Sequence, residues 1–319
     1  MGEHTLSSLG IVAGLATAGL WAMTAVSFEA ASKRIGSLSV NVLRLAVAAL
    51  LFVGLSLVRT GHALPSGLTQ AAWMGLSLSG LVGFVVGDLM LFQAFVLIGA
   101  RLSMLIYASV PAMTALAGYA FLGERLGARA LAGMGVTVVG ILLAVMGKGP
   151  DSLAPKRRLS QRTGILLAVG GSAGQAAGLL LAKHGAHGLD SFTATQVRVL
   201  AGLLGFIAVA AIAGQLPALW SLLEGALNTP ADVSSAARVR SVRVALVFLS
   251  AGALFGPFLG VSLGLLSAQL LPVGVASTLM SLVPVLLIPI AAITMGERAS
   301  ATEIAGTVVA FAGVVVMAA

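Results

Sequence analysis

Long apolar runs alternate with short polar or basic segments along the whole chain. Each run stays apolar for about 20 residues, the length a helix needs to cross the hydrocarbon of a bilayer. A membrane barrel would show strands of about ten residues with alternating polarity. The pattern therefore predicts an all-α membrane protein. We expect ten transmembrane helices, at residues 7–31, 39–59, 69–98, 102–122, 128–147, 163–183, 191–213, 243–270, 273–295 and 301–318.

Two polar stretches interrupt this pattern. Residues 148–162 form a linker at mid-chain, and residues 214–242 form a longer loop. The loop contains apolar residues that could make one face of a short helix in the membrane interface. An ordinary loop is the alternative, and the pattern leaves both open. The residues of the possible apolar face are Leu219, Trp220, Leu222, Leu223, Ala226 and Leu227.

A motif of the first half recurs in the second. Pro111 recurs 173 residues later as Pro284, and Gly123-Glu124-Arg125 recurs as Gly296-Glu297-Arg298. Such self-similarity is the signature of an internal repeat.

The repeat continues toward the start of each half at a smaller offset. Arg44 recurs 154 residues later as Arg198, and the longer loop accounts for the change. The chain is thus predicted to consist of two five-helix repeats, residues 1–150 and 151–319. An odd number of helices inverts the second unit in the membrane, as in many secondary transporters with a central cavity.

Composition excludes the soluble classes. The chain is 59% hydrophobic and 9% charged, with mean hydropathy +1.07, and it lacks the polar surface of a soluble domain. Cysteine is absent, so disulfides and thiolate sites are excluded. The net charge of +8 does not indicate nucleic acid, because the basic residues flank the apolar runs. The first run is too long for a cleaved signal, so we expect a retained helix.

Several of these segments resemble the EamA-type pattern of the drug/metabolite transporter superfamily. The resemblance covers nearly the whole chain, once per half, and implies a ten-helix basket around a cavity. It also implies a metabolite or amino-acid carrier, often an exporter, in a bacterial inner membrane. The segments that carry it are Leu20-Trp21-Ala22, Asn41 to Ala46, Gly87-Asp88-Leu89 through Gln93-Ala94, and Pro111 followed by Leu122-Gly123-Glu124-Arg125.

The second half departs from this pattern. Gln175 stands where the repeat would place Trp21, and Val261 stands where it would place Asp88. Orientation also stays open, since the basic loop residues favour termini outside, whereas the resemblance favours termini inside.

Asp88 is the one acid deep within an apolar run. A charge there costs about 2.5–3.5 kcal/mol on insertion scales, so something must offset it. A water-filled cavity, a protonatable relay or a cationic substrate would do so, and we expect Asp88 to be the main ionisable group of a transport pathway. The alternative is a carboxyl that bridges helices.

Positions where the halves differ are the better site candidates, because one asymmetric substrate breaks two-fold symmetry. Interhelical hydrogen bonds or core packing are the alternatives for each. The residues expected to bind substrate or protons are Trp21, Asp88, Gln93, Tyr107, Gln175 and Gln269.

Positions that the halves share are expected to be structural or to serve gating. Arginines near helix ends can extend to the interface, prolines kink helices, and glycines four residues apart allow close helix contact. Glu124 and Glu297 are expected in weak loop ion pairs. The remaining structural candidates are Arg44, Arg198, Pro111, Pro284, Gly256 and Gly260, within the series Gly252, Gly256, Gly260, Gly264 and its shorter twin Ser79, Gly83, Gly87.

No motif indicates a cofactor. His184, His187 and Asp190 are three residues apart and could share a helix face, but a helix end explains them better than a metal. Gly147-Lys148-Gly149 lacks the spacing of a phosphate loop, so no ATPase is expected. The chain is therefore not expected to be an enzyme. We expect a secondary carrier for a small molecule such as an amino acid or amine, acting by alternating access and using protons as a possible coupling ion. A membrane-embedded enzyme and a non-transporting scaffold are the alternatives.

Overall fold

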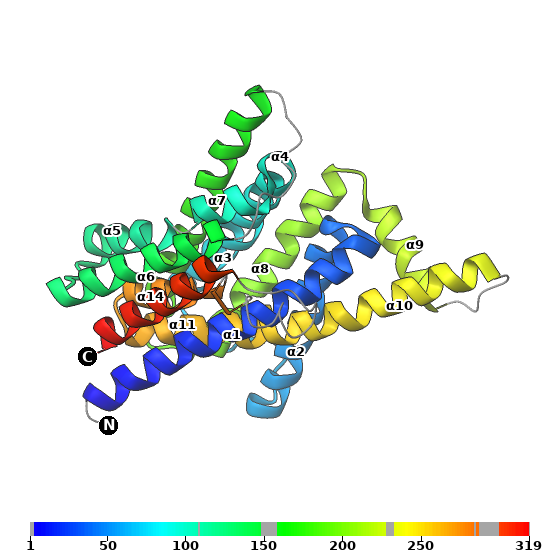
Figure 1. Ribbon diagram of the computed structural model, residues 1–319. Coiled ribbons are helices and arrows are strands. Elements are labelled where there is room, and N and C mark those ends of the chain that lie inside the picture. The colour runs from blue at the N-terminus through cyan, green and yellow to red at the C-terminus, as the bar shows by residue number, and fades with distance from the viewer. Residues whose placement is uncertain are drawn as a thin grey trace.

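The protein is described by a computed structural model that covers residues 3–107, 109–147, 158–227, 233–283, 285–286 and 300–318. The described part of the chain is all-α and contains no strand, as predicted. Figure 1 shows the arrangement of its helices. In chain order they are α1 (Glu3–Ile35), α2 (Ser37–Thr60), α3 (Gln70–Gly80), η1 (Leu81–Gly87), α4 (Asp88–Tyr107), α5 (Val110–Leu122), α6 (Ala128–Gly147), α7 (Arg158–Gly185), α8 (Ser191–Ile212), α9 (Leu216–Leu227), α10 (Val233–Ala253), η2 (Leu254–Gly260), α11 (Val261–Leu270), α12 (Val273–Met280) and α14 (Ala301–Ala318).

Within these residues, six helical segments are long and apolar enough to cross a membrane. Three further apolar helices are shorter, at Val110–Leu122, Ala128–Ala144 and Ala301–Val316. The prediction of a multipass membrane protein is therefore confirmed at this level. The six longer segments are Leu6–Thr24, Leu38–Thr60, Gln70–Leu91, Gln161–Gly185, Ser191–Ile212 and Val239–Leu270.

The predicted boundary between the third and fourth helices is wrong. The helix was expected to end at residue 98, but α4 continues to Tyr107, and α5 begins at Val110. Pro111 consequently lies in the first turn of α5 and does not kink a helix. A proline there removes no hydrogen bond, because first-turn N–H groups have no partner within the helix.

The stretch 214–242, predicted as a loop, contains helix in the parts that the structure describes. Of its two alternatives the short helix is confirmed, as α9, and α10 begins at Val233, ahead of the predicted start. Leu219 of α9 is buried, whereas Trp220 is exposed. The apolar face of α9 is thus only partly covered by the rest of the protein.

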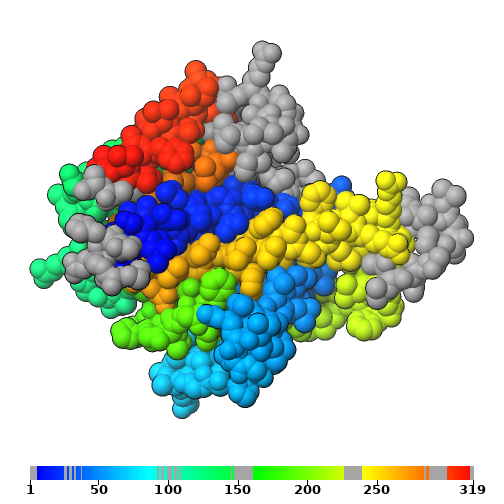
Figure 2. All heavy atoms as spheres, turned by 90° about the horizontal axis from the view of Figure 1, so that it is seen from below, coloured from blue at the N-terminus to red at the C-terminus, as the bar shows by residue number. Residues whose placement is uncertain are grey.

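Helix α1 packs against the glycine series of the second half. Phe28, Thr24, Trp21 and Thr17 lie against Gly252, Gly256, Gly260 and Gly264 in that order. The numbers fall on one helix as they rise on the other, so the two helices run antiparallel. Figure 2 shows α1 (blue) lying along α10 (yellow) and the helices that follow it (orange).

The corresponding segment of the first half packs against α7. A Cβ atom on Gly178 would lie 2.7 Å from Cα of Gly83, and one on Gly174 would lie 2.8 Å from Cα of Gly87. Ser79 Oγ donates a hydrogen bond of 2.6 Å to the Gly178 carbonyl. Backbone meets backbone here, which only small residues allow. This contact is also antiparallel.

Helices α6 and α14 make the third close antiparallel contact. A Cβ atom on Gly140 would lie 2.2 Å from the backbone nitrogen of Ala310, and one on Gly313 would lie 2.4 Å from that of Thr137. The start of α1 and the end of α14 lie at the same end of the molecule (Figure 1).

Candidate functional site

The central polar group is an ion pair between Arg44 of α2 and Asp88, the first residue of α4. Nη2 of Arg44 donates to Oδ2 of Asp88, and the two side chains are only 11% and 13% exposed. Gln175 of α7 donates from Nε2 to Oδ1 of Asp88 at 2.7 Å and to the Gly83 carbonyl at 3.1 Å. The cluster therefore joins α2 and the η1–α4 junction of the first half to α7 of the second.

Small residues make this cluster possible. A Cβ atom on Gly87 would lie 3.1 Å from Nε2 of Gln175. A Cβ atom at this position would crowd the Gln175 amide that donates to Asp88. The glycine series of η1 thus sets the distance between the halves at the site.

Arg198 of α8 lies near the same segment, and the described residues supply no counterion for it. Arg198 is 6% exposed. Its guanidinium carbon lies 5.2 Å from the Phe84 ring centroid, and its Nη2 atom would be 3.8 Å from a Cβ atom on Gly83. Its Nε has no hydrogen-bond partner. No acid of the described residues forms an ion pair with it.

The sequence put the interface within reach of Arg44 and Arg198, but both side chains stay inside the protein. Each lies seven residues after the first residue of its helix, about 10 Å along the axis. Arg44 turns sideways to Asp88, and Arg198 turns to Phe84. An available carboxylate and an aromatic face hold the guanidinium groups inside the protein.

The other asymmetric candidates lie in different surroundings. Trp21 packs its indole against Gly260. Tyr107 is the last residue of α4 and is half-buried. The side chain of Gln93 is exposed. Gln269 donates to the carbonyls of Ala186 and Leu189, at 3.1 and 2.9 Å, an interhelical role.

Of the structural candidates, Gly256 contacts Thr24 and Gly260 contacts Trp21, both on α1. Pro111 is buried at the start of α5. Pro284 lies outside the described residues, as do Glu297 and its neighbours.

Glu124 is not the weak loop ion pair that was expected. One carboxylate oxygen accepts from Nζ of Lys183 at 2.6 Å and the other accepts from the backbone N–H of Val273 at 2.8 Å. Lys183 also donates to the Leu271 carbonyl at 2.7 Å. Both side chains are largely buried, at 19% and 15% exposure for Lys183 and Glu124. The group ties the end of α5 to α7 and to the turn before α12. The Gly-Glu-Arg motif marked Glu124 in the sequence, but nothing in the sequence indicated that Lys183 would be its partner.

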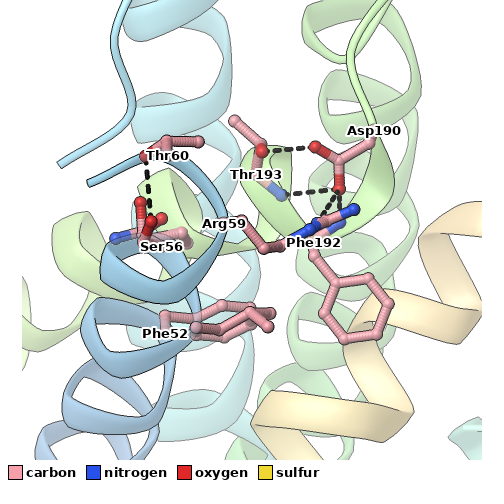
Figure 3. A pocket seen from close by; sticks show the side chains of 9 residues that line it. Phe52, Ser56, Arg59, Thr60, Asp190, Phe192 and Thr193 are labelled. Atoms are coloured by element: carbon pink, nitrogen blue, oxygen red, sulfur yellow. Dashed lines mark hydrogen bonds and ion pairs between the residues drawn. The ribbon is translucent and has the colours of Figure 1, made fainter. Parts of the chain in front are cut away.

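A pocket of about 260 Å³ opens between the end of α2 and the start of α8 (Figure 3). Arg59 Nη1 lies 3.4 Å from Oδ1 of Asp190 in its lining. Phe52, which also lines it, makes an edge-to-face contact with Phe258, with ring centroids 4.7 Å apart. Phe192 completes this group. Sequence reasoning missed the pocket, because its residues come from two distant helices.

Asp190 serves as the N-cap of α8. Its carboxylate accepts from the N–H groups of Phe192 and Thr193. Partial burial raises the pKa of Asp190, but the hydrogen bonds from Thr193 and Phe192 and the Arg59 charge outweigh it, so that the pKa lies below its ordinary value. His184 and His187 are exposed, and the described residues contain no group of three potential metal ligands.

Comparison with known proteins adds the family. The pattern of the EamA-like transporter family matches residues 8–146 and again residues 162–319. The chain belongs to the EamA-like transporter family. Members of this family are membrane transporters of the drug/metabolite transporter superfamily.

The likeness extends to solved structures. One, described only as the crystal structure of a protein, aligns with a TM-score of 0.71 at 16% identity, covering 97% of this chain and 96% of its own. At this identity the likeness shows the fold alone. The comparison with curated proteins gives no match. The EamA-like family and the apolar helices together make the chain a multipass membrane protein of a transporter family.

Proposed function

We propose that the protein is a secondary carrier that moves a small metabolite by alternating access, with Asp88, Arg44 and Gln175 at the centre of its pathway. The observation that carries this proposal is that both halves contribute to one buried polar cluster. A buried ion pair stabilises a fold weakly. Its presence between moving parts of a transporter is better explained by function.

The proposal includes ten transmembrane helices in two inverted units, residues 1–150 and 151–319. The antiparallel contacts support it. Gly140 lies against Ala310, and Gly313 lies against Thr137; the repeat makes Gly140 equivalent to Gly313, and Thr137 to Ala310. Equivalent helices α6 and α14 would run parallel if the symmetry axis followed the membrane normal. An axis within the membrane plane makes them antiparallel.

The cluster offers a chemical basis for coupling. A proton on Asp88, or a cationic amine beside it, competes with Arg44 for the carboxylate. The hydrogen bond from Gln175 crosses between the halves, so a change at Asp88 alters a contact that holds them together. The glycine faces on either side allow helices to slide with little steric cost.

The group around Glu124 supports a gate at one end of the molecule. It joins α5 of the first half to α7 and the α11–α12 turn of the second. In the sequence, the repeat makes Glu297 the equivalent of Glu124 and Glu29 the equivalent of Lys183, so the second copy lacks the lysine of this pair.

We further propose that the cargo is an amino acid or amine and that the chain works as an exporter in a bacterial inner membrane. The sequence has no phosphate loop for its own nucleotide hydrolysis, so a gradient would drive transport.

Flux into or out of proteoliposomes tests the proposal. Vesicles holding the wild-type chain are assayed with amino acids, amines and carboxylic acids, with and without a pH gradient, against vesicles holding Asp88→Asn. We expect uptake or exchange of a member of this panel by the wild type and loss of gradient-driven flux in Asp88→Asn. Absence of flux for every compound, or an unchanged pH profile in the inserted variant, would overturn the proposed function.

A further inference from the structure

We infer that the cargo carries a carboxylate group and that Arg198 binds it. This inference rests on the proposed function and narrows its substrate class. It begins from a buried cation that has no acidic partner among the described residues.

A guanidinium group stays protonated in proteins, so Arg198 is charged although it is 6% exposed. Burying an unpaired charge is costly. The Phe84 ring beneath it supplies a cation–π contact, which is worth about 2 kcal/mol or more in a desolvated site but brings no negative charge. The Nε atom donates to nothing. An anion supplied from outside the chain would satisfy the group.

The repeat shows what the missing partner is. Arg44, at the equivalent position, has its charge neutralised by Asp88, although its Nε, like that of Arg198, has no hydrogen-bond partner. The position equivalent to Asp88 in the second half is Val261, which has no charge. The carboxylate that neutralises the arginine in one half is therefore absent from the other. We expect the cargo to provide it.

The surroundings of Arg198 suit a small carboxylate with an amino group. Gly83 lies next to Nη2 of Arg198, and Asp88 follows five residues later, about one π-helical turn away. Gln175 touches both positions through the Gly83 carbonyl and the Asp88 carboxylate. Two guanidinium groups and one carboxylate leave an excess of one positive charge. An amino acid would place its carboxylate on Arg198, where the planar fork can form two hydrogen bonds, and its ammonium toward Asp88.

Thermal unfolding of the purified chain in detergent tests this directly, at constant ionic strength. The probes are matched sets built on glycine, alanine, leucine and phenylalanine: the amino acid, the amine without its carboxyl group and the acid without its amino group. Sodium phosphate is a further probe. The variants are Arg198→Gln, Arg198→Lys, which keeps the charge, and Arg129→Gln, an exposed control on α6.

We expect carboxylate-bearing probes, and not amines, to raise the unfolding temperature of the wild type and of Arg129→Gln. Binding in Arg198→Gln should be roughly ten- to hundredfold weaker, with Arg198→Lys between the two. Equal shifts in wild type and Arg198→Gln, stabilisation by amines or phosphate alone, or no shift with any carboxylate would overturn the inference. Amine flux in the proteoliposome assay would at the same time uphold the proposed function, so the two can fail separately.

Discussion

Arg44 and Arg198 occupy equivalent positions in the two halves, and the structure gives them different fates. Arg44 forms an ion pair with Asp88, whereas Arg198 lies buried against Phe84. No acid of the described residues forms an ion pair with Arg198. The helices that carry them begin seven residues earlier in both cases. A duplicated scaffold therefore keeps its positive charge twice and its negative charge once. The unbalanced half is where a ligand can be selected by charge.

Packing residues show the opposite behaviour. The segments η1 and η2 are both π-helical, and each presents small residues to a helix of the other half. Close helix contact needs small residues wherever it occurs, so both halves keep them. The charged residues of the two halves can differ more easily. Replacing one acid changes the pairing of a single arginine and leaves the helix contacts in place.

The largest expected effect comes from removing each arginine in turn. Arg44→Gln leaves Asp88 buried without its cation and should reduce the free energy of unfolding by about 3–5 kcal/mol. Arg198→Gln removes a charge that has no partner, so it should leave stability unchanged or raised. Denaturant titration in detergent measures both.

The double variant Arg44→Gln with Asp88→Asn serves as the control for that comparison. It removes both charges and should recover most of the lost stability. If Arg198→Gln proved as destabilising as Arg44→Gln, the conclusion that only Arg44 is held by an acid would be contradicted.

The next effect compares equivalent glycines. Gly260→Ala would place a Cβ atom 2.6 Å from the Trp21 indole, whereas Gly87→Ala meets the Gln175 amide at 3.1 Å. We expect Gly260→Ala to cost about 1–3 kcal/mol of unfolding free energy through overpacking, and Gly87→Ala to cost less because an amide side chain can shift. Gly135→Ala on α6 faces open space and should be neutral or stabilising by up to about 1 kcal/mol. Equal unfolding temperatures for all three variants would remove this difference.

A smaller effect concerns the hydrogen bonds of Glu124 that join the two halves at one end of the molecule. Glu124→Gln weakens the charged hydrogen bonds to Lys183 and to the Val273 amide, each worth about 1.5–3 kcal/mol in general. Hydrogen exchange of the segment around Val273 should become faster. The exposed acid Glu224, bonded to Trp220, gives a control, since Glu224→Gln should leave that exchange unchanged. Unaltered protection in Glu124→Gln would show that the group does not close this end.

The smallest effect contrasts the exposed pair Arg59–Asp190 with the buried one. The pKa of Asp190 lies below its ordinary value when folded, so its charge stabilises the protein above the unfolded pKa, and this contribution is lost as pH falls through the folded pKa. Solvent screening limits it to a few tenths of a kcal/mol, by order of magnitude.

Asp190→Asn keeps the helix cap and removes the charge. The wild type should therefore unfold slightly higher than this variant at neutral pH, and the two should converge in acid. A difference that grew as the pH fell would contradict the assigned direction of the pKa.

The apolar runs predicted an all-α membrane chain because each run must bury or face lipid along its whole length, a property of local composition. Boundaries were predicted less well. The break expected near residue 98 lies beyond Tyr107, because α4 packs along α7, with Leu97 and Ile98 against Gly164. Tertiary contact of this kind outweighs the local preference of Gly99 to interrupt a helix.

The candidate site shows the same division. Asp88 and Gln175 were selected from sequence as polar residues in apolar runs, and they meet in one cluster. Arg44 was assigned to structure because both halves have it, and Gln269 was assigned to the pathway although it holds the end of α7. Repeat symmetry identifies which positions differ, but it does not say where a long side chain turns.

The sequence by itself thus determined the membrane class, the family and the repeated small residues, all of which follow from local composition and spacing. Only the tertiary structure decided that Arg44 reaches Asp88, that Arg198 has no such partner among the described residues, and that Glu124 joins Lys183 to the turn at Leu271. The physical reason is that electrostatic and hydrogen-bond energies depend on distances between side chains on different helices. Those distances are set by how closely the glycine faces allow the helices to approach.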